Sequence, residues 1–199
     1  MPYLGKSTLT EIITYEDQIQ GKSPLKLHLG CGARHFTGYI NIDCRKTAAT
    51  DLVCDIRKLP YKNNTVEMIE CYHLIEHLPV CLMANIVHGW GEKYASSILF
   101  LKEWNRVLEP EGKLIIEAPD FEKIIAEYIN ADEARKEELL VYIYGGYRHN
   151  DIQNIHRWGV NKYRLKYILE KASFRNITFE EPRSYQKEFC PCLRVEAIK

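Results

Sequence analysis

The stretch that decides the fold is Leu25-Lys-Leu-His-Leu-Gly-Cys-Gly32, near the start of the chain. Apolar and polar residues alternate up to Leu29, which predicts a β-strand, and the two glycines that follow predict a tight turn. Because glycine has no side chain, the backbone of such a turn can approach a ligand closely and offer its N–H groups. The stretch therefore predicts a strand that ends at a binding turn.

Two more short strands are predicted directly downstream, over Tyr39–Asp43 and Asp51–Asp55, and each ends on an acidic residue. Further strands are predicted over 66–71, 113–118, 176–180 and 193–198, and helices over 98–108, after the N-cap Asp120 and after the N-cap Asn161. Strands that alternate with helices are typical of an α/β fold, in which a mostly parallel sheet is covered on both faces. The last two strands are adjacent in sequence and predict a terminal hairpin with one antiparallel strand.

The composition limits the class of protein. The chain has 199 residues, with 27 Lys and Arg against 27 Asp and Glu, so it fits one domain and lacks the basic excess typical of nucleic-acid binding. No apolar run approaches the roughly 20 residues of a membrane-spanning helix, and no secretory signal is recognisable. The seven cysteines are odd in number and form no Cys-x-x-Cys pair, which predicts reduced thiols and a cytoplasmic protein. We divide the chain into an N-terminal extension, residues 1–24, and one domain, residues 25–199.

The residues just after each strand are the candidate binding residues, because ligands of such sheets bind beyond the carboxyl ends of the strands. There, Asp43 is suited to the hydroxyls of a ribose, and Asp55 to an adenine amino group. A dinucleotide site is disfavoured, because His35 stands where its motif requires a third glycine and Asp43 follows the first glycine too early. The order of glycines, acid and acid predicts a nucleoside site of another kind.

The motifs along the chain are, in order, Leu29-Gly-Cys-Gly32, Gly38-Tyr-Ile-Asn-Ile-Asp43, Asp55-Ile-Arg-Lys-Leu-Pro60, Glu76-His77-Leu78, Arg106-Val-Leu-Glu-Pro-Glu-Gly112 and Ala118-Pro-Asp120. Together they resemble class I S-adenosylmethionine-dependent methyltransferases, and most closely a small branch with a short helix between Gly32 and Asp43. The resemblance implies a three-layer Rossmann-like fold with a seven-stranded, mostly parallel sheet and an antiparallel last strand. It also implies S-adenosylmethionine as the cofactor and methyl transfer as the activity.

The resemblance assigns the cofactor to eight residues: Gly30, Cys31, Gly32, Asp43, Asp55, Ile56, Tyr72 and His73. The glycine turn would follow the methionine and ribose parts, and Asp43 would hold the ribose hydroxyls. Asp55 and Ile56 would frame the adenine. The backbone near Tyr72 and His73 would face the cofactor.

Two residues depart from the family's pattern. His28 stands where many members have an acid that helps to hold the amino group of the cofactor. Glu111 stands where glycine is usual, and we expect only a local backbone difference there. Because His28 is not an acid, the contact to the amino group of the cofactor must come from another residue.

Methyl transfer to a hydroxyl or amine also requires a base near the methyl group. The candidates are Asp120, His149 and His156. Asp120 follows a strand at the correct edge of the sheet but also suits a helix N-cap. The two histidines lie in the glycine- and aromatic-rich segment 144–159, which suits a substrate-side loop and an ordinary surface loop equally. We expect a small-molecule or glycan-precursor acceptor, and neither a nucleic-acid nor a membrane partner.

Other interpretations stay open. His73-Leu-Ile-Glu76-His77 matches a zinc-peptidase pattern if it lies on one helix, but Pro79 would end that helix early. We therefore assign no metal ligand, although a metal-assisted methyl transfer is not excluded. Cys31, at a predicted helix N-terminus, is a candidate nucleophile without an evident base. The missing first-strand acid also fits a non-catalytic S-adenosylmethionine-binding module, and the segment 80–90 suits a partner contact or a substrate lid.

Overall fold

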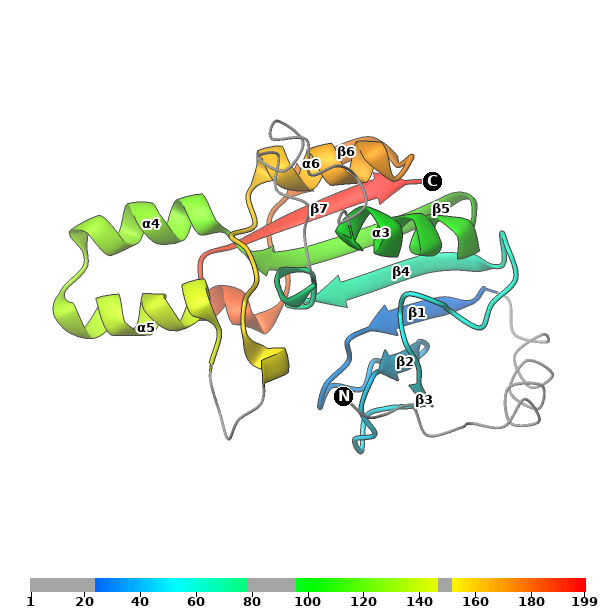
Figure 1. Ribbon diagram of the computed structural model, residues 1–199, viewed down its shortest axis with the longest axis horizontal. Helices are drawn as coiled ribbons and strands as arrows, with labels where there is room; N and C mark the ends of the chain where they lie inside the picture. The colour runs from blue at the N-terminus through cyan, green and yellow to red at the C-terminus, as the bar shows by residue number, and fades with distance from the viewer. Residues whose placement is uncertain (1–23, 79–95, 147–151) are drawn as a thin grey trace.

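Seven strands form one sheet in the order β3-β2-β1-β4-β5-β7-β6 (Figure 1). The computed structural model describes residues 24–78, 96–146 and 152–199. The strands are β1 (Lys26–Leu29), β2 (Ile40–Asp43), β3 (Leu52–Val53), β4 (Val66–Tyr72), β5 (Leu108–Pro119), β6 (Arg175–Glu180) and β7 (Cys192–Ile198). Strand β7 is antiparallel to its neighbours β5 and β6, and the other pairs of neighbours are parallel. The predicted α/β class, with a mostly parallel sheet and an antiparallel last strand, is confirmed.

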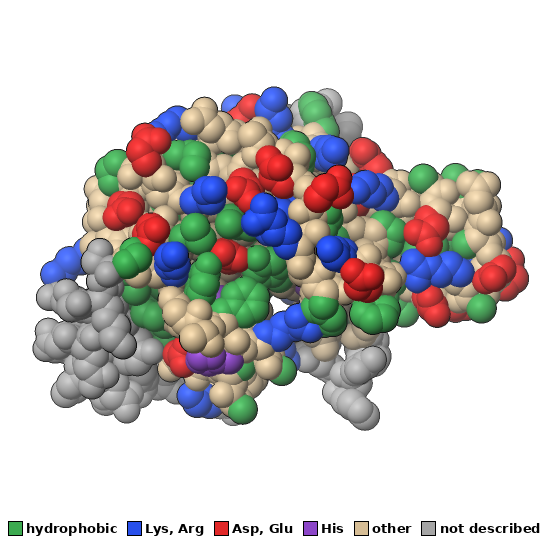
Figure 2. All heavy atoms as spheres, turned by 180° about the vertical axis from the view of Figure 1, so that it is seen from behind, with side chains coloured by type: hydrophobic (Ala, Val, Ile, Leu, Met, Phe, Trp, Pro, Cys, Tyr) green, Lys and Arg blue, Asp and Glu red, His purple; other side chains and the backbone are tan. Residues whose placement is uncertain are grey.

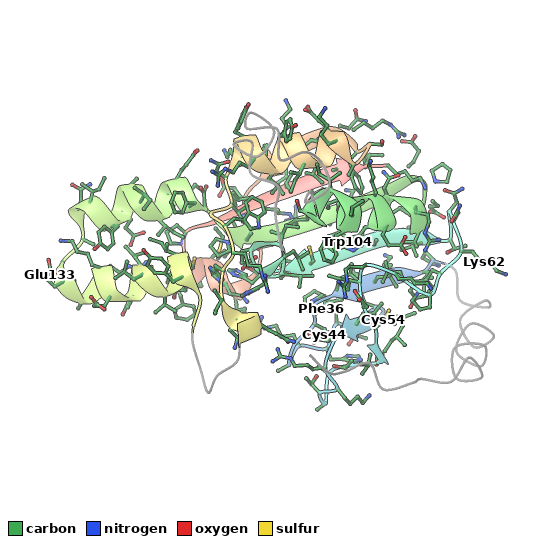
Figure 3. All side chains as sticks on the ribbon, viewed as in Figure 1. Phe36, Cys44, Cys54, Lys62, Trp104 and Glu133 are labelled. Atoms are coloured by element: carbon green, nitrogen blue, oxygen red, sulfur yellow. The ribbon has the colours of Figure 1, made fainter. Side chains whose placement is uncertain are left out.

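Two helices, α3 (Ser96–Val107) and α6 (Lys162–Lys171), share one apolar core with the sheet. Their buried residues recur at helical spacing, as predicted, and pack against alternate residues of the central strands. Trp104 is fully buried and points from α3 towards the sheet (Figure 3). Its indole Nε1 donates to the carbonyl oxygen of Ile56 at 3.1 Å. One side chain therefore joins the core to the loop that follows β3.

Helices α4 (Phe121–Asn130) and α5 (Glu133–Tyr144) form a hairpin beyond the carboxyl ends of the parallel strands (Figure 1). Helix α4 begins after the predicted cap, Asp120. No apolar stripe marks α5, in which only Leu139 is buried, so the sequence did not predict this helix. The hairpin packs against the chain around Cys190 and Cys192. Short 3₁₀ helices follow β4 (η1, Ile75–His77), precede α6 (η3, Ile152–Asn154) and precede β7 (η4, Tyr185–Glu188).

The face of the sheet opposite α3 is charged, and Figure 2 shows acidic and basic side chains intermixed across the back of the molecule. This face holds a groove of about 350 Å³ lined by Lys26, Tyr39, Met68, Glu70, Tyr72, Lys113, Ile115, Arg183, Arg194 and Glu196. Beside it, Arg194 Nη1 donates to Glu117 Oε1 at 2.8 Å, and both side chains are buried.

The helices within residues 24–78, 96–146 and 152–199 include none with the length and hydropathy of a membrane-spanning helix.

The loop that leads into β2 corrects one expectation. The short helix expected between Gly32 and Asp43 is absent, and residues 33–39 form turns instead. Phe36 stacks on His28 with ring centroids 3.9 Å apart, and its backbone N–H donates to Asn41 Oδ1 at 2.8 Å. These contacts hold the loop against β1 and β2. The backbone between Gly32 and β2 therefore forms turns in place of a helix.

Glu111 keeps the backbone conformation of the glycine that it replaces. Its φ angle is 66°, in the left-handed region that favours glycine. Its carboxylate pairs with Arg175 on β6. Glycine and Glu111 can therefore share this backbone conformation, and the expected local backbone difference stays a prediction.

Replacing Gly145 by alanine is expected to lower the free energy of unfolding by roughly 2 kcal/mol or more, because its backbone conformation is open almost only to glycine. Gly145 ends α5 with φ 81° and ψ 160°, and an added Cβ would lie 1.9 Å from the carbonyl oxygen of Asn154. Its neighbour Gly146 is a matched control, since a Cβ there meets no atom within 4 Å. Urea unfolding measures both variants, and equal stabilities would contradict the prediction.

Candidate functional site

The glycine turn after β1 has the conformation that its sequence predicts. Gly30 and Gly32 have φ angles of 68° and 54°, in the region that favours glycine. The N–H of Cys31 donates to the carbonyl of Ile42 at 3.0 Å, which fixes the turn to β2. A Cβ on Gly30 would lie 2.8 Å from Leu74 Cδ1, whereas a Cβ on Gly32 would meet nothing within 4 Å. The side chain of Leu74 therefore packs against Gly30, whereas the space beside Gly32 is open.

Asp43, at the end of β2, lies directly against this turn. Its Oδ2 accepts a hydrogen bond from the N–H of Gly32 at 2.9 Å. Its Oδ1 accepts from the N–H of Arg45 at 2.9 Å. The side chain is 8% exposed, so a buried carboxylate and a glycine turn meet at one edge of the sheet. The structure thus brings together Gly30, Gly32 and Asp43, as the order of the strands predicted.

Asp55 and Ile56 lie in the turn after β3. The N–H of Cys54 donates to the carbonyl of Asp43 at 3.0 Å, so this turn follows directly beside Asp43. The carboxylate of Asp55 accepts hydrogen bonds from the backbone N–H and the guanidinium of Arg57. The bond to the guanidinium, more than any other contact, lowers the pKa of Asp55. Asp55 is therefore anchored in its own turn as a carboxylate.

Tyr72 and His73, at the end of β4, point in different directions. The hydroxyl of Tyr72 donates to Glu70 on the charged face of the sheet. His73 has a φ angle of 51°, and its ring lies between Cys192 Sγ, 3.6 Å from Nε2, and Glu76 Oε1, 3.4 Å from Nδ1. Burial lowers the pKa of His73, but these two contacts outweigh it and raise the pKa to about 10. The N–H of His73 donates to the carbonyl of Glu117 on β5 at 2.9 Å, and the role of the backbone of this pair at the cofactor stays a prediction.

His28, which replaces the usual acid, has a structural role. Its ring is buried between Phe36 and the sheet, and Nδ1 lies 3.0 Å from Asn41 Oδ1. Burial lowers its pKa, so the ring is neutral and cannot replace an acid as the partner of a cationic amino group. The remaining cradle, an open glycine turn with a buried acid against it, still fits a nucleoside.

The candidate bases have different surroundings. Asp120 caps α4, and its Oδ1 accepts from the N–H groups of Glu122 and Lys123 at 3.2 and 3.4 Å. His156 is largely buried, which lowers its pKa, and its Nδ1 lies 2.9 Å from the carbonyl oxygen of Tyr142. His149 lies outside the described residues, as does the segment 80–90. Asp120 is thus a helix cap, as its position after β5 allowed.

The zinc-peptidase interpretation is wrong in its geometry. His73 lies before η1 with a left-handed backbone, and η1 is a single 3₁₀ turn. His73 and His77 therefore do not share the face of an α-helix, which that pattern requires. What the sequence could not show is that His156, far along the chain, lies beside Glu76 and His77.

The structure also does not support Cys31 as a reactive nucleophile. Burial raises the pKa of this thiol, and no helix begins at the turn. A raised pKa keeps the sulfur protonated and unreactive at neutral pH. Cys31 is a small residue in a tight turn.

The fold is a seven-stranded α/β sheet whose carboxyl edge brings a glycine turn and the buried carboxylate of Asp43 together. Residues 27–116, somewhat less than half of the chain, match the family model described as a methyltransferase domain. No curated protein sequence matches the chain.

Solved structures similar to this chain include S-adenosylmethionine-dependent methyltransferases. One is from Thermotoga maritima, with 12% identity, 96% of this chain and 88% of that chain covered, and a TM-score of 0.54. Another is from Archaeoglobus fulgidus, with 14% identity, coverage of 96% and 92%, and a TM-score of 0.52. The 1,6-didemethyltoxoflavin-N1-methyltransferase of Burkholderia thailandensis has 13% identity, coverage of 95% and 76%, and a TM-score of 0.54, and its structure contains S-adenosylhomocysteine. At these identities the structures show a shared fold, and the domain match over residues 27–116 is consistent with the resemblance to class I methyltransferases.

Proposed function

We propose that residues 25–199 form an enzyme that transfers a methyl group from S-adenosylmethionine to a small-molecule acceptor. The observation that carries the proposal is the 2.9 Å contact between Asp43 Oδ2 and the N–H of Gly32, which places an acid against an open glycine turn. This arrangement suits a ribose, because the acid accepts from its hydroxyls while the bare backbone allows close approach. The methyltransferase domain match over residues 27–116 supports the same assignment.

In this proposal, the chain's own residues mainly bind the cofactor and orient it towards the acceptor. S-adenosylmethionine supplies an activated methyl group on a sulfonium with a good leaving group, so the protein contributes alignment more than bond-breaking chemistry. Gly30, Cys31 and Gly32 carry the backbone that lies along the cofactor, and Asp43 holds the ribose. Asp55 and Ile56 lie in the adjoining turn, where they would border the adenine.

The acceptor side would lie where β4 and β5 end. Asp120 and His156 are the described candidates there for removing a proton from the acceptor. His156 suits that role better, because the cap of α4 already engages Asp120 Oδ1 and burial keeps the imidazole neutral. A neutral imidazole can accept a proton directly.

Calorimetry tests the cofactor assignment. Titration of S-adenosylhomocysteine into the full chain is expected to show one binding site per chain, and NAD titrated under the same conditions is expected to show none. The structural reason is that His35 occupies the position of the third glycine that a dinucleotide motif needs. Binding of NAD alone would reverse the assignment.

A second candidate function, a cofactor-binding module without catalysis, is favoured by His28 in place of the usual acid. Incubation of the chain with labelled S-adenosylmethionine and a small-molecule extract separates the two. Transfer of label to an extract component supports the enzyme. Saturable cofactor binding without any transfer supports the module.

A further inference from the structure

Three side chains from two distant parts of the sequence converge at the end of β4. They are Glu76 and His77 of η1 and His156 of the segment that follows η3, and one ligand atom of each lies within 4.8 Å of the others. Glu76 Oε1 lies 4.0 Å from His156 Nε2. The rings of His77 and His156 meet edge to face, with centroids 4.8 Å apart. A carboxylate and two imidazoles therefore face one small space.

The backbone holds the two parts together. The N–H of Arg157 donates to the carbonyl of Glu76 at 2.8 Å. The indole Nε1 of Trp158 donates to the carbonyl of Ile75 at 2.9 Å, in a buried contact. Because hydrogen bonds join the two segments next to the cluster, the fold holds the three side chains close together.

Both histidines are oriented as metal ligands are. Nδ1 of His77 lies 3.2 Å from the carbonyl oxygen of Ile155, and Nδ1 of His156 lies 2.9 Å from that of Tyr142. A carbonyl oxygen can only accept, so Nδ1 carries the proton in each ring. The lone pair is then on Nε2, the atom that remains for a ligand. Metal-binding histidines almost always donate their other N–H in this way.

Glu76 supplies an independent observation. Its side chain is 1% exposed, and both carboxylate oxygens are buried without a hydrogen-bond partner among the described residues. The ring of His73, the charged partner described above, lies with Nδ1 3.4 Å from Oε1 but makes no hydrogen bond to it. A buried carboxylate is costly unless cations and hydrogen bonds satisfy both oxygens, and Oε2 has no hydrogen-bond partner among the described residues. A cavity of about 10 Å³ lies against Glu76 and His156, which is about the space of one water molecule or ion.

We propose that Glu76, His77 and His156 bind one zinc ion. Two imidazoles and one carboxylate form a ligand set that zinc uses in proteins with a fourth position open, and imidazoles disfavour magnesium and calcium. Zinc ligands lie about 2.0–2.2 Å from the metal, so the side chains would close in slightly around the ion. This site replaces the set His73, Glu76 and His77 that the sequence pattern had indicated. Because zinc would occupy Nε2 of His156, Asp120 is the described candidate base when the ion is bound.

Calorimetry with zinc chloride tests the site, on full-length protein without a histidine tag and stripped with a chelator. We expect one zinc ion per chain, and at least tenfold weaker binding in Glu76→Gln and in His156→Gln. His35→Gln is the matched control, because His35 also faces a carboxylate, Asp51 Oδ1 at 3.5 Å, but on the surface and without a third ligand among the residues that the structure describes. The control is expected to bind zinc like the wild type. Magnesium chloride is expected to bind more weakly than zinc.

The shift of the Tm on addition of zinc tests the site even if a variant is less stable than the wild type. Zinc is expected to raise the Tm of the wild type and of His35→Gln but not that of Glu76→Gln. Zinc binding that Glu76→Gln and His156→Gln leave intact would overturn the proposal, as would the absence of stoichiometric zinc in the wild type. Titration of S-adenosylhomocysteine into the same proteins reports separately on the cofactor site, so the two proposals can fail independently.

Discussion

Asp43→Ala is expected to weaken binding of S-adenosylhomocysteine by about tenfold to a hundredfold, because a hydrogen bond to a charged group contributes about 1.5–3 kcal/mol. The carboxylate is held against the glycine turn by the N–H of Gly32 and is fixed on its other side by the N–H of Arg45. It is therefore preorganised, and its loss removes both a contact and the order of the turn. Calorimetry against the wild type measures the change in Kd.

The control for this variant is Asp132→Ala. Asp132 caps α5 by accepting from the N–H of Arg135 at 2.8 Å, so it has a similar local role far from the glycine turn. We expect it to lower stability by about 1 kcal/mol and to leave the affinity for S-adenosylhomocysteine unchanged. Unchanged affinity in Asp43→Ala, with the fold intact by circular dichroism, would remove the main support for the proposed cofactor site.

Trp104→Ala is expected to lower the free energy of unfolding by about 3–5 kcal/mol, as is usual for a large aromatic side chain lost from a core. Trp104 is fully buried between α3 and the sheet, and its Nε1 donates to the carbonyl of Ile56. The variant therefore leaves a cavity and also releases the turn that carries Asp55. Urea unfolding followed by circular dichroism measures the loss.

Leu99→Ala is the matched control on the same helix, since Leu99 is 60% exposed and its replacement is expected to change stability by less than about 0.5 kcal/mol. Trp104→Phe separates the two effects, because it keeps most of the ring and removes only the N–H donor. Its loss of stability is expected to fall between those of the other two variants. Equal stability of Trp104→Ala and Leu99→Ala would contradict the packing described.

Much of the fold follows from local sequence, because its signals are local. Asp120 and Asn161 were predicted as helix caps, and each accepts hydrogen bonds from the first turn of its helix. The strand before the glycine turn was predicted from alternation, although its polar residue His28 is buried as well as its neighbours Leu27 and Leu29. Helix α5 was missed because a hairpin that projects from the sheet buries little, and only Leu139 is enclosed.

The site was predictable where the order of strands determines it. Gly32 and Asp43 follow neighbouring parallel strands, so their meeting depends on topology alone. The approach of His156 to Glu76 depends instead on the path of the chain through α4 and α5, and no local pattern encodes it. The absence of a helix after Gly32 is not encoded locally either, since Phe36 of this loop stacks on His28, which is buried on β1.

The buried pair of Glu117 and Arg194 joins two strands that are far apart in sequence. Glu117 also accepts from the N–H groups of Arg183 and Ser184, so its charge is matched from several sides. Arg194 in turn pairs with Glu196 at 2.8 Å, so the loss of Glu117 would leave its partner with one carboxylate, whereas the loss of Arg194 would leave Glu117 with backbone donors only. Position 194 should consequently tolerate an apolar residue less readily than position 117 does in the descent of this chain, because a buried carboxylate without a cation is costly.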